Sequence, residues 1–189
     1  MPRRITKVTI GEEAFIMMIA GAAEVYDKET YGLLIGRRRR NDYLVQYAVP
    51  HQTTRRYTYG VQITPKHEKK LLQTINFFKG YKYMGEFHSH PNDACILSKQ
   101  DRKDMIESPL GVSIVIRIDR HDSYLKWKYD EKDKCLYGSI DDSYYIEVKA
   151  YRRDDTGKRI RKLRLNCPFI KKLNNRVKRV YPGFFEKPK

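Results

Sequence analysis

The chain has 189 residues, enough for one compact domain with an extra terminal element. Its 39 lysines and arginines outnumber 23 acidic residues, and the resulting formal charge of +16 favours anionic partners. No segment resembles a signal peptide or reaches the ~20 apolar residues of a membrane span, and three widely spaced cysteines indicate no disulfide framework, so we expect a cytoplasmic protein without a membrane partner.

The first half of the chain predicts two helices and two strands. Residues Glu12 to Tyr26 carry apolar side chains at helical spacing: Phe15, Met18, Ile19, Ala22 and Val25. Strands are predicted at Tyr31–Ile35 and Tyr43–Val49, joined by a basic turn from Arg37 to Asp42. Pro65 opens a second helix, whose apolar face is formed by Leu71, Leu72, Ile75 and Phe78.

The second half predicts more strands and two further helices. Ser98 begins a helix, and the nearly continuous apolar run Val112–Ile118 is typical of a central strand. Further strands are predicted at Tyr124–Tyr129 and Tyr144–Tyr151, a hairpin at Ile146–Leu165 turning at Asp154–Gly157, and a last helix from Pro168. We therefore predict an α/β fold with a mixed sheet: a domain over residues 1–150, and a basic hairpin and helix over 151–189 packed on it.

The strongest chemical signal is the run Phe87-His88-Ser89-His90-Pro91, followed by Ser98 and Asp101. Side chains two apart on a strand share a face, so both imidazoles point the same way. Pro91 lacks an N–H, which predicts that they lie at a sheet edge or strand terminus. Asp101, in the first turn of the following helix, can turn back toward them. Two neutral imidazoles and one carboxylate, with water as fourth ligand, are typical of a catalytic zinc site.

Simpler interpretations exist for several of these residues. Ser98 and Asp101 also match an ordinary Ser-x-x-acid capping pattern. Cys95 is interpreted as a small packing residue rather than a ligand. The remaining histidines, which lack a comparable setting, are interpreted as surface or loop residues: His51, His67 and His121.

The pattern resembles the motif of the JAMM (MPN+, or Jab/MPN) metalloproteases, which is Glu, then His-Ser/Thr-His-Pro, then Ser-x-x-Asp. Here it is formed by Glu29, the run from His88 to Pro91, Ser98 and Asp101, with the family's ten residues between the second histidine and the aspartate. The resemblance implies a mixed sheet sandwiched between helices, with a cytidine-deaminase-like core. It fades beyond about residue 150.

Carried over to this chain, the resemblance implies that His88, His90 and Asp101 bind one zinc ion. It makes Glu29 the general base and Ser98 the donor that stabilises the oxyanion. The ligand set by itself does not separate zinc from other divalent ions.

The resemblance also implies the function: a zinc-dependent isopeptidase or peptidase that cleaves at the C-terminus of an acidic ubiquitin-like modifier. The loop His51–Gly60, with Arg55, Arg56 and Tyr57, is the candidate for recognition of the modifier's tail. One alternative is processing of a sulfur-carrier protein's C-terminus in biosynthesis. Another is a basic module associated with nucleic acid, which is not favoured because the basic residues are scattered along the sequence rather than gathered with aromatic residues. The sequence does not indicate the oligomeric state or an activating partner.

Overall fold

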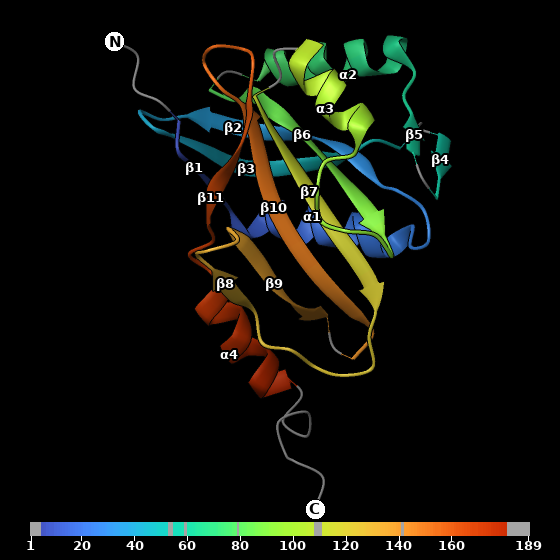
Figure 1. The fold of residues 1–189 in the computed structure, drawn as a ribbon, viewed down its shortest axis with the longest axis vertical. Coiled ribbons are helices and arrows are strands. Elements are labelled where there is room, and N and C mark those ends of the chain that lie inside the picture. The colour runs from blue at the N-terminus through green and yellow to red at the C-terminus, as the bar shows by residue number, and fades with distance from the viewer. Residues whose placement is uncertain are drawn as a thin grey trace, which may run out of the picture.

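The computed structural model describes residues 5–52, 55–58, 60–78, 80–107, 111–140 and 142–180, with side chains up to residue 175 (Figure 1). This part contains eleven strands and four helices. In chain order they are β1 (Lys7–Ile10), α1 (Glu12–Glu24), β2 (Tyr31–Arg38), β3 (Asp42–Pro50), β4 (Arg55–Tyr57), β5 (Gly60–Gln62), α2 (Pro65–Phe77), β6 (Lys82–Pro91), α3 (Lys99–Glu107), β7 (Val112–Arg120), β8 (Lys128–Asp130), β9 (Cys135–Ile140), β10 (Tyr144–Arg153), β11 (Ile160–Asn166) and α4 (Ile170–Val180). The predicted mixed α/β fold is confirmed.

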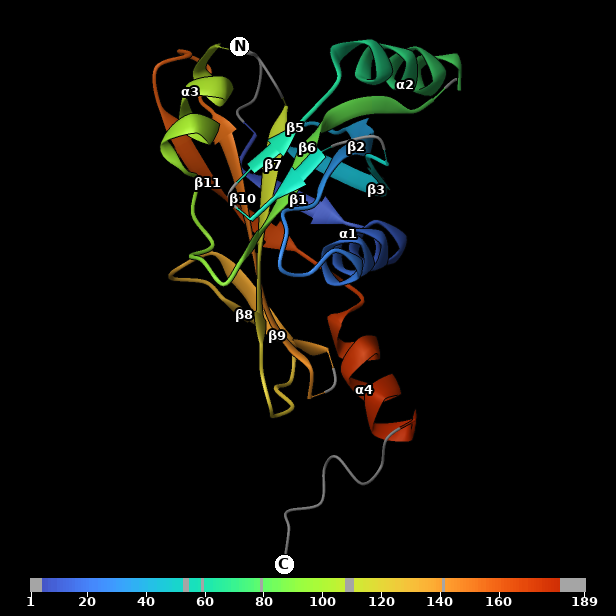
Figure 2. The same ribbon diagram turned by 90° about the vertical axis from the view of Figure 1, so that its right-hand side faces the viewer.

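Nine strands form one strongly curved mixed sheet in the order β11-β1-β3-β2-β6-β7-β10-β9-β8. Three pairs are parallel, namely β1 with β3, β1 with β11 and β6 with β7, whereas the others are antiparallel. β11 also pairs with β10, so the sheet closes on itself between its first and seventh strands. β4 and β5 form a separate two-stranded hairpin, which lies between α3 and α2 in the view of Figure 2.

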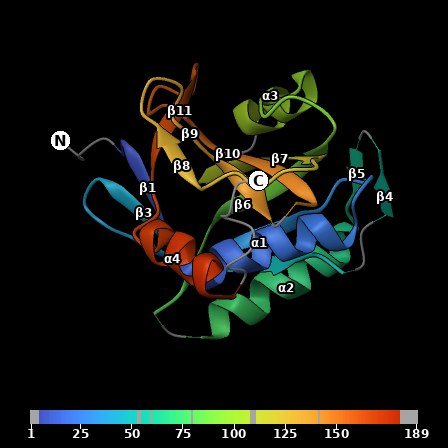
Figure 3. The ribbon, with the colours of Figure 1, turned by 90° about the horizontal axis from the view of Figure 1, so that it is seen from below.

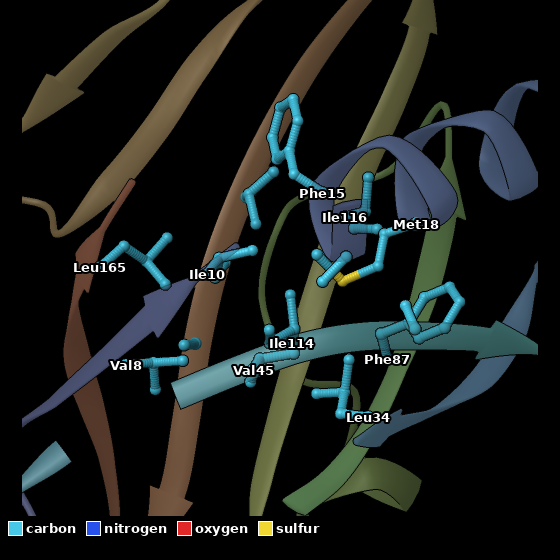
Figure 4. Packing of buried hydrophobic residues seen from close by; sticks show 14 of the residues in the cluster. Val8, Ile10, Phe15, Met18, Leu34, Val45, Phe87, Ile114, Ile116 and Leu165 are labelled. Carbon is cyan, nitrogen blue, oxygen red and sulfur yellow. The ribbon is translucent and has the colours of Figure 1, made fainter. Parts of the chain in front are cut away.

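Alternating side chains divide the apolar residues of the sheet between two faces. One face forms the main core with Phe15 and Met18 of α1, and Figure 4 shows Phe87 and Ile114 pointing into it. On the opposite face, α2 packs on β2 and α3 packs on β7. In the view from below, α3 lies on one side of the sheet and α1 on the other (Figure 3). The side chain that follows Phe87 on β6 therefore points toward the α2 and α3 side.

Several predicted elements differ from the structure. Of the strand predicted at Tyr124–Tyr129, only its last two residues fall in a strand, β8. α2 ends at Phe77, and Phe78 is 57% exposed rather than part of an apolar face. The sequence interpretation missed β9 and three strands of only three or four residues, β1, β4 and β5. The predicted hairpin at Ile146–Leu165 is confirmed as β10 and β11. Within the described ranges, no helix has the length and apolar character needed to cross a membrane.

Candidate metal centre

β6 carries two histidines on one face near its carboxyl end. His88 and His90 have ring centroids 5.0 Å apart. β6 is an internal strand, in which His88 pairs with Tyr31 of β2 and Val115 of β7. The predicted strand terminus is confirmed, but a sheet edge is wrong. Pairing with β7 continues through Pro91 even though proline lacks an N–H.

A β-bulge decides which face these histidines occupy. Two adjacent residues of β2 pair with Tyr83 and Gly85, so Met84 is an extra residue in β6. Met84 and Phe87 consequently both face the main core although they are three residues apart. Gly85 has a φ of 142°, and a Cβ there would lie 1.8 Å from the carbonyl oxygen of Val112. Glycine therefore permits the bulge that turns the histidines toward α2 and α3.

Asp101 is directed toward the histidines by the first turn of α3. Its Oδ2 accepts a hydrogen bond from the Ser98 backbone N–H at 2.7 Å, and its own N–H donates to Ser98 Oγ at 3.1 Å. The reciprocal pair is a capping box, so the structural interpretation of this pattern is confirmed. The same Oδ2 lies 3.5 Å from His88 Nε2 and 3.7 Å from His90 Nε2. One ligand atom from each of these three residues lies within 4.8 Å of the others.

The three side chains are strongly coupled electrostatically. Burial alone would raise the pKa of Asp101, but the neighbouring His88 and the bonds from Ser98 outweigh burial and hold this pKa below its usual value. Burial opposes charge on His88 as well, yet Asp101 raises the pKa of this imidazole. The pKa of His90 is lowered, chiefly by burial and then by His88. A divalent cation would neutralise the negative charge of Asp101 and accept a lone pair from each imidazole.

The donor atoms fit a metal ion. His88 Nε2 is buried and has no hydrogen-bond partner among the described residues. His90 Nδ1 lies 3.1 Å from the carbonyl oxygen of Ala94, which fixes the proton on Nδ1 and leaves the Nε2 lone pair free. A backbone acceptor behind an imidazole is the usual arrangement of a metal-binding histidine. His88, His90 and Asp101 could therefore hold one divalent ion, although this donor set does not identify which one.

Glu29 lies in the same cleft, just before β2. Its N–H donates to the carbonyl oxygen of Tyr57 at 3.0 Å in the β4–β5 hairpin. The next residue, Thr30, exchanges two bonds with Ser89: Thr30 N–H donates to Ser89 Oγ at 2.8 Å and Ser89 N–H donates to Thr30 O at 3.0 Å. These bonds connect the segment that carries Glu29 to β6. They are made by Ser89, whose side chain lies on the face of β6 opposite the histidines. Burial raises the pKa of Glu29 to about 7, partly opposed by His88.

These residues line one cleft of about 310 Å³ between β6, α3 and the β4–β5 hairpin. The structure brings together all five predicted site residues, Glu29, His88, His90, Ser98 and Asp101. It also adds a half-buried carboxylate, Glu86, which the sequence interpretation missed. Glu86 precedes His88 by two residues and hence shares its face, a signal that was present in the sequence. Tyr31 Oη donates to Glu86 Oε2 at 3.2 Å, and burial raises the pKa of Glu86.

The remaining histidines and Cys95 lie outside the triad. His51 lies in a loop after β3, as one of the two predicted alternatives states, but it is buried rather than at the surface, and its ring faces Tyr31. His67 is exposed on α2, and His121 follows β7 at a half-buried position. Cys95 is confirmed as a packing residue, since it is buried and its Sγ donates to Val115 O at 3.3 Å.

Comparison with known proteins bears on both the site and the fold. A family model described as prokaryotic homologs of the JAB domain matches residues 11–128, which include all five predicted site residues. No curated protein matches the chain in sequence. Among solved structures, the solution structure of protein DSY2949 from Desulfitobacterium hafniense is similar in fold, with a TM-score of 0.58 and 18% identity. The match covers 85% of this chain and 92% of that one.

Proposed function

Because this chain belongs to the family of prokaryotic homologues of the JAB domain, we propose that it is a zinc-dependent isopeptidase or peptidase acting at the C-terminus of a ubiquitin-like modifier. The observation that carries the proposal is the shared cleft, in which the three metal-binding side chains and a carboxylate with a raised pKa lie together. Perturbed carboxylates beside a metal site are typical of hydrolytic centres.

His88, His90 and Asp101 would hold the ion, which when bound supplies Lewis acidity and a water of lowered pKa. Glu29 is the base in this proposal. Its carboxylate accepts a proton from the water that attacks the scissile carbonyl, and then delivers that proton to the leaving amine. The pKa of this carboxyl group is about 7 in the metal-free protein, and the charge of a bound cation would lower it, so Glu29 would be ionised and able to accept a proton near neutral pH.

Ser98 has a hydroxyl group that can serve two roles at once. Its Oγ already accepts the Asp101 N–H, which uses a lone pair of the oxygen and leaves the hydroxyl proton free to donate. Ser98 lines the cleft, where a donor aimed at the developing oxyanion stabilises the transition state. Capping and oxyanion stabilisation are therefore compatible.

The β4–β5 hairpin is the proposed contact for the modifier's extended tail. Arg55 and Tyr57 are exposed on it, while Arg56 Nη2 donates to the His51 carbonyl oxygen at 2.7 Å and anchors the hairpin. Its backbone bond to Glu29 connects it to the base. A tail could add to a hairpin edge through main-chain hydrogen bonds, and the arginines would favour an acidic modifier.

Metal analysis combined with a cleavage assay tests the proposal. Purified wild type should hold near-stoichiometric zinc and cleave one of a panel of conjugates of ubiquitin-like and sulfur-carrier proteins until a chelator is added. His88→Ala and Asp101→Ala should lose both metal and cleavage. Glu29→Gln should keep the metal but lose about 10²- to 10⁴-fold in kcat. The exposed His67→Ala is the matched control and should behave as wild type.

Each outcome tests a separate part of the proposal. Cleavage that survives chelation would rule out metal-dependent hydrolysis. Full activity in Glu29→Gln would remove this residue as the base while leaving the metal site intact.

A further inference from the structure

Exposed aromatic and arginine side chains meet where α2 ends beside the turn between β2 and β3. Phe77 is 80% exposed and Phe78 is 57% exposed, with ring centroids 5.7 Å apart. Tyr47 of β3 is 44% exposed and contacts Tyr81, with ring centroids 5.5 Å apart. Arg37 covers Tyr81, with its Cζ 5.4 Å from the ring centroid. Elements far apart in the sequence thus form one surface, here termed the aromatic-arginine patch: Arg37, Tyr47, Phe77, Phe78 and Tyr81.

A run of positive charge adjoins the patch at Arg37. Residues 37–40 are four consecutive arginines, all exposed, and none forms an ion pair with a described residue. Asp42, in the same turn, does not neutralise them, because it is buried and accepts hydrogen bonds from Thr9 N–H and Oγ1 at 3.0 and 2.8 Å. The sequence alone does not predict this arrangement, because the arginines precede the phenylalanines by about forty positions.

We propose that the aromatic-arginine patch binds single-stranded nucleic acid. Rings exposed beside unpaired guanidinium groups combine the two elements of such sites: planar surfaces on which bases stack and cations that pair with phosphates. A duplex does not offer its base faces, so the exposed phenylalanines favour a single strand. An acidic protein would use the arginines but would gain no stacking of bases on the rings.

The patch is separate from the metal cleft. β6 begins with Lys82 beside the end of α2 and runs away from it to the histidines (Figure 1). The six residue-to-residue steps of strand from Lys82 to His88 span about 20 Å. The patch therefore does not depend on the proposed hydrolytic function, and His88→Ala should bind nucleic acid as wild type does.

Fluorescence anisotropy with labelled oligonucleotides tests the proposal. The probes are an oligothymidylate of about 20 nucleotides, which exceeds the length of one such binding surface, a duplex of similar length, and polyglutamate as an anionic polymer without bases. Wild type should prefer the single strand to both other probes. Phe77→Leu/Phe78→Leu retains apolar bulk but removes the rings, and should weaken binding at least about fivefold. Tyr57→Leu, which removes an exposed ring outside the patch, is its control.

Salt dependence tests the arginines. Arg37→Ala/Arg39→Ala removes the patch arginine and one charge of the adjoining run, and should lower the slope of log affinity against log salt by about 1.4, the value expected for two phosphate contacts to a single strand. Lys158→Ala/Arg159→Ala removes two exposed charges from the β10–β11 turn and should leave the slope unchanged.

Four outcomes would overturn the proposal. They are absence of binding near physiological salt, equal affinity for polyglutamate, no effect of the leucine substitutions, or equal losses in the patch and control charge variants. Equal affinity for polyglutamate would indicate a docking surface for acidic proteins, and equal losses would indicate unspecific attraction to a basic molecule.

Discussion

The carboxyl group of Glu29 is partly buried, which brings its pKa near neutral pH and makes its ionised form unfavourable for folding. Burial raises its pKa from 4.5 to about 7, so the folded chain binds this proton more tightly than the unfolded chain does. Stability therefore falls as the pH rises from 4.5 through 7, and the full loss is present at higher pH. A carboxylate retained at such a position is consistent with a trade between stability and activity.

We therefore expect Glu29→Gln to stabilise the metal-free protein only at higher pH. With chelator present and the pH well above 7, its Tm should exceed that of wild type, whereas near pH 4.5 the two should agree. Thermal unfolding followed by circular dichroism measures this difference. Glu24→Gln, which changes an exposed carboxylate at the end of α1, should leave Tm unchanged at both pH values. A lower Tm for Glu29→Gln at high pH would show instead that the ionised carboxylate stabilises the fold.

At the scale of elements, α3 connects helix capping with the metal site. Ser98 caps the helix through the Asp101 N–H, and the carboxylate of Asp101 returns the bond while facing both histidines. The N-terminus of α3 also favours negative charge at this position. A residue that begins a helix thus also positions a candidate metal ligand.

Alanine and glycine at position 98 separate the two roles of Ser98. Ser98→Ala should destabilise the protein by about 1 kcal/mol, whereas Ser98→Gly should cost only a few tenths, because glycine is tolerated at helix N-caps. If the hydroxyl also donates to the oxyanion, both variants should lose about 10²-fold or more in kcat. Urea unfolding and steady-state kinetics measure the two quantities. Near-normal kcat in Ser98→Gly would mean that the hydroxyl acts only as a cap.

The sequence predicts a structural element correctly where the pattern that identifies it lies within a few neighbouring residues. The facing histidines, the capped helix and the buried strand β7 all follow from spacing within a few residues. β1 and the β4–β5 hairpin were missed because strands of three or four residues carry too little alternation, and β1 pairs with β3 and β11, which lie far along the chain. Burial of His51 depends on packing with Tyr31 and has no local signature.

The bulge at Met84 shows how the site depends on tertiary structure. Alternation alone correctly places His88 and His90 together but does not say which face of the sheet they occupy. The extra residue and the positive φ of Gly85 determine that face through the approach of Val112 on β7. The contacts that complete the cleft, including Tyr31 with Glu86, likewise join residues more than fifty positions apart.

For the whole molecule, charge is distributed unevenly. The chain carries a formal charge of +16, yet the described lining of the metal cleft contains carboxylates and no lysine or arginine: Glu29, Glu86, Asp93, Asp101 and Asp104. This local negative potential favours a divalent cation, while the basic exterior attracts anionic macromolecules. The molecule can therefore concentrate a cation and an anionic partner on separate surfaces.

Closure of the sheet makes the segment after residue 150 part of the whole molecule's stability. β11 pairs with β1 on one side and with β10 on the other, although it is the last strand of the described part of the chain. Beyond it, Phe169 packs on Phe15 of α1, with ring centroids 5.0 Å apart. The division of the chain at residue 150 stays a prediction, and removing successive elements from the C-terminus tests it.

We expect a chain truncated after Arg153 to lose cooperative folding, because both β1 and β10 would expose unpaired backbone edges. A chain truncated after Asn166 keeps β11 and loses the buried ring of Phe169, so it should fold but be less stable by about 3 kcal/mol or more. Urea unfolding followed by circular dichroism distinguishes the two. A cooperative transition at the wild-type midpoint for the shorter chain would show that residues beyond 153 are an accessory extension. Loss of folding in both chains would place α4, rather than strand pairing alone, among the elements that the core requires.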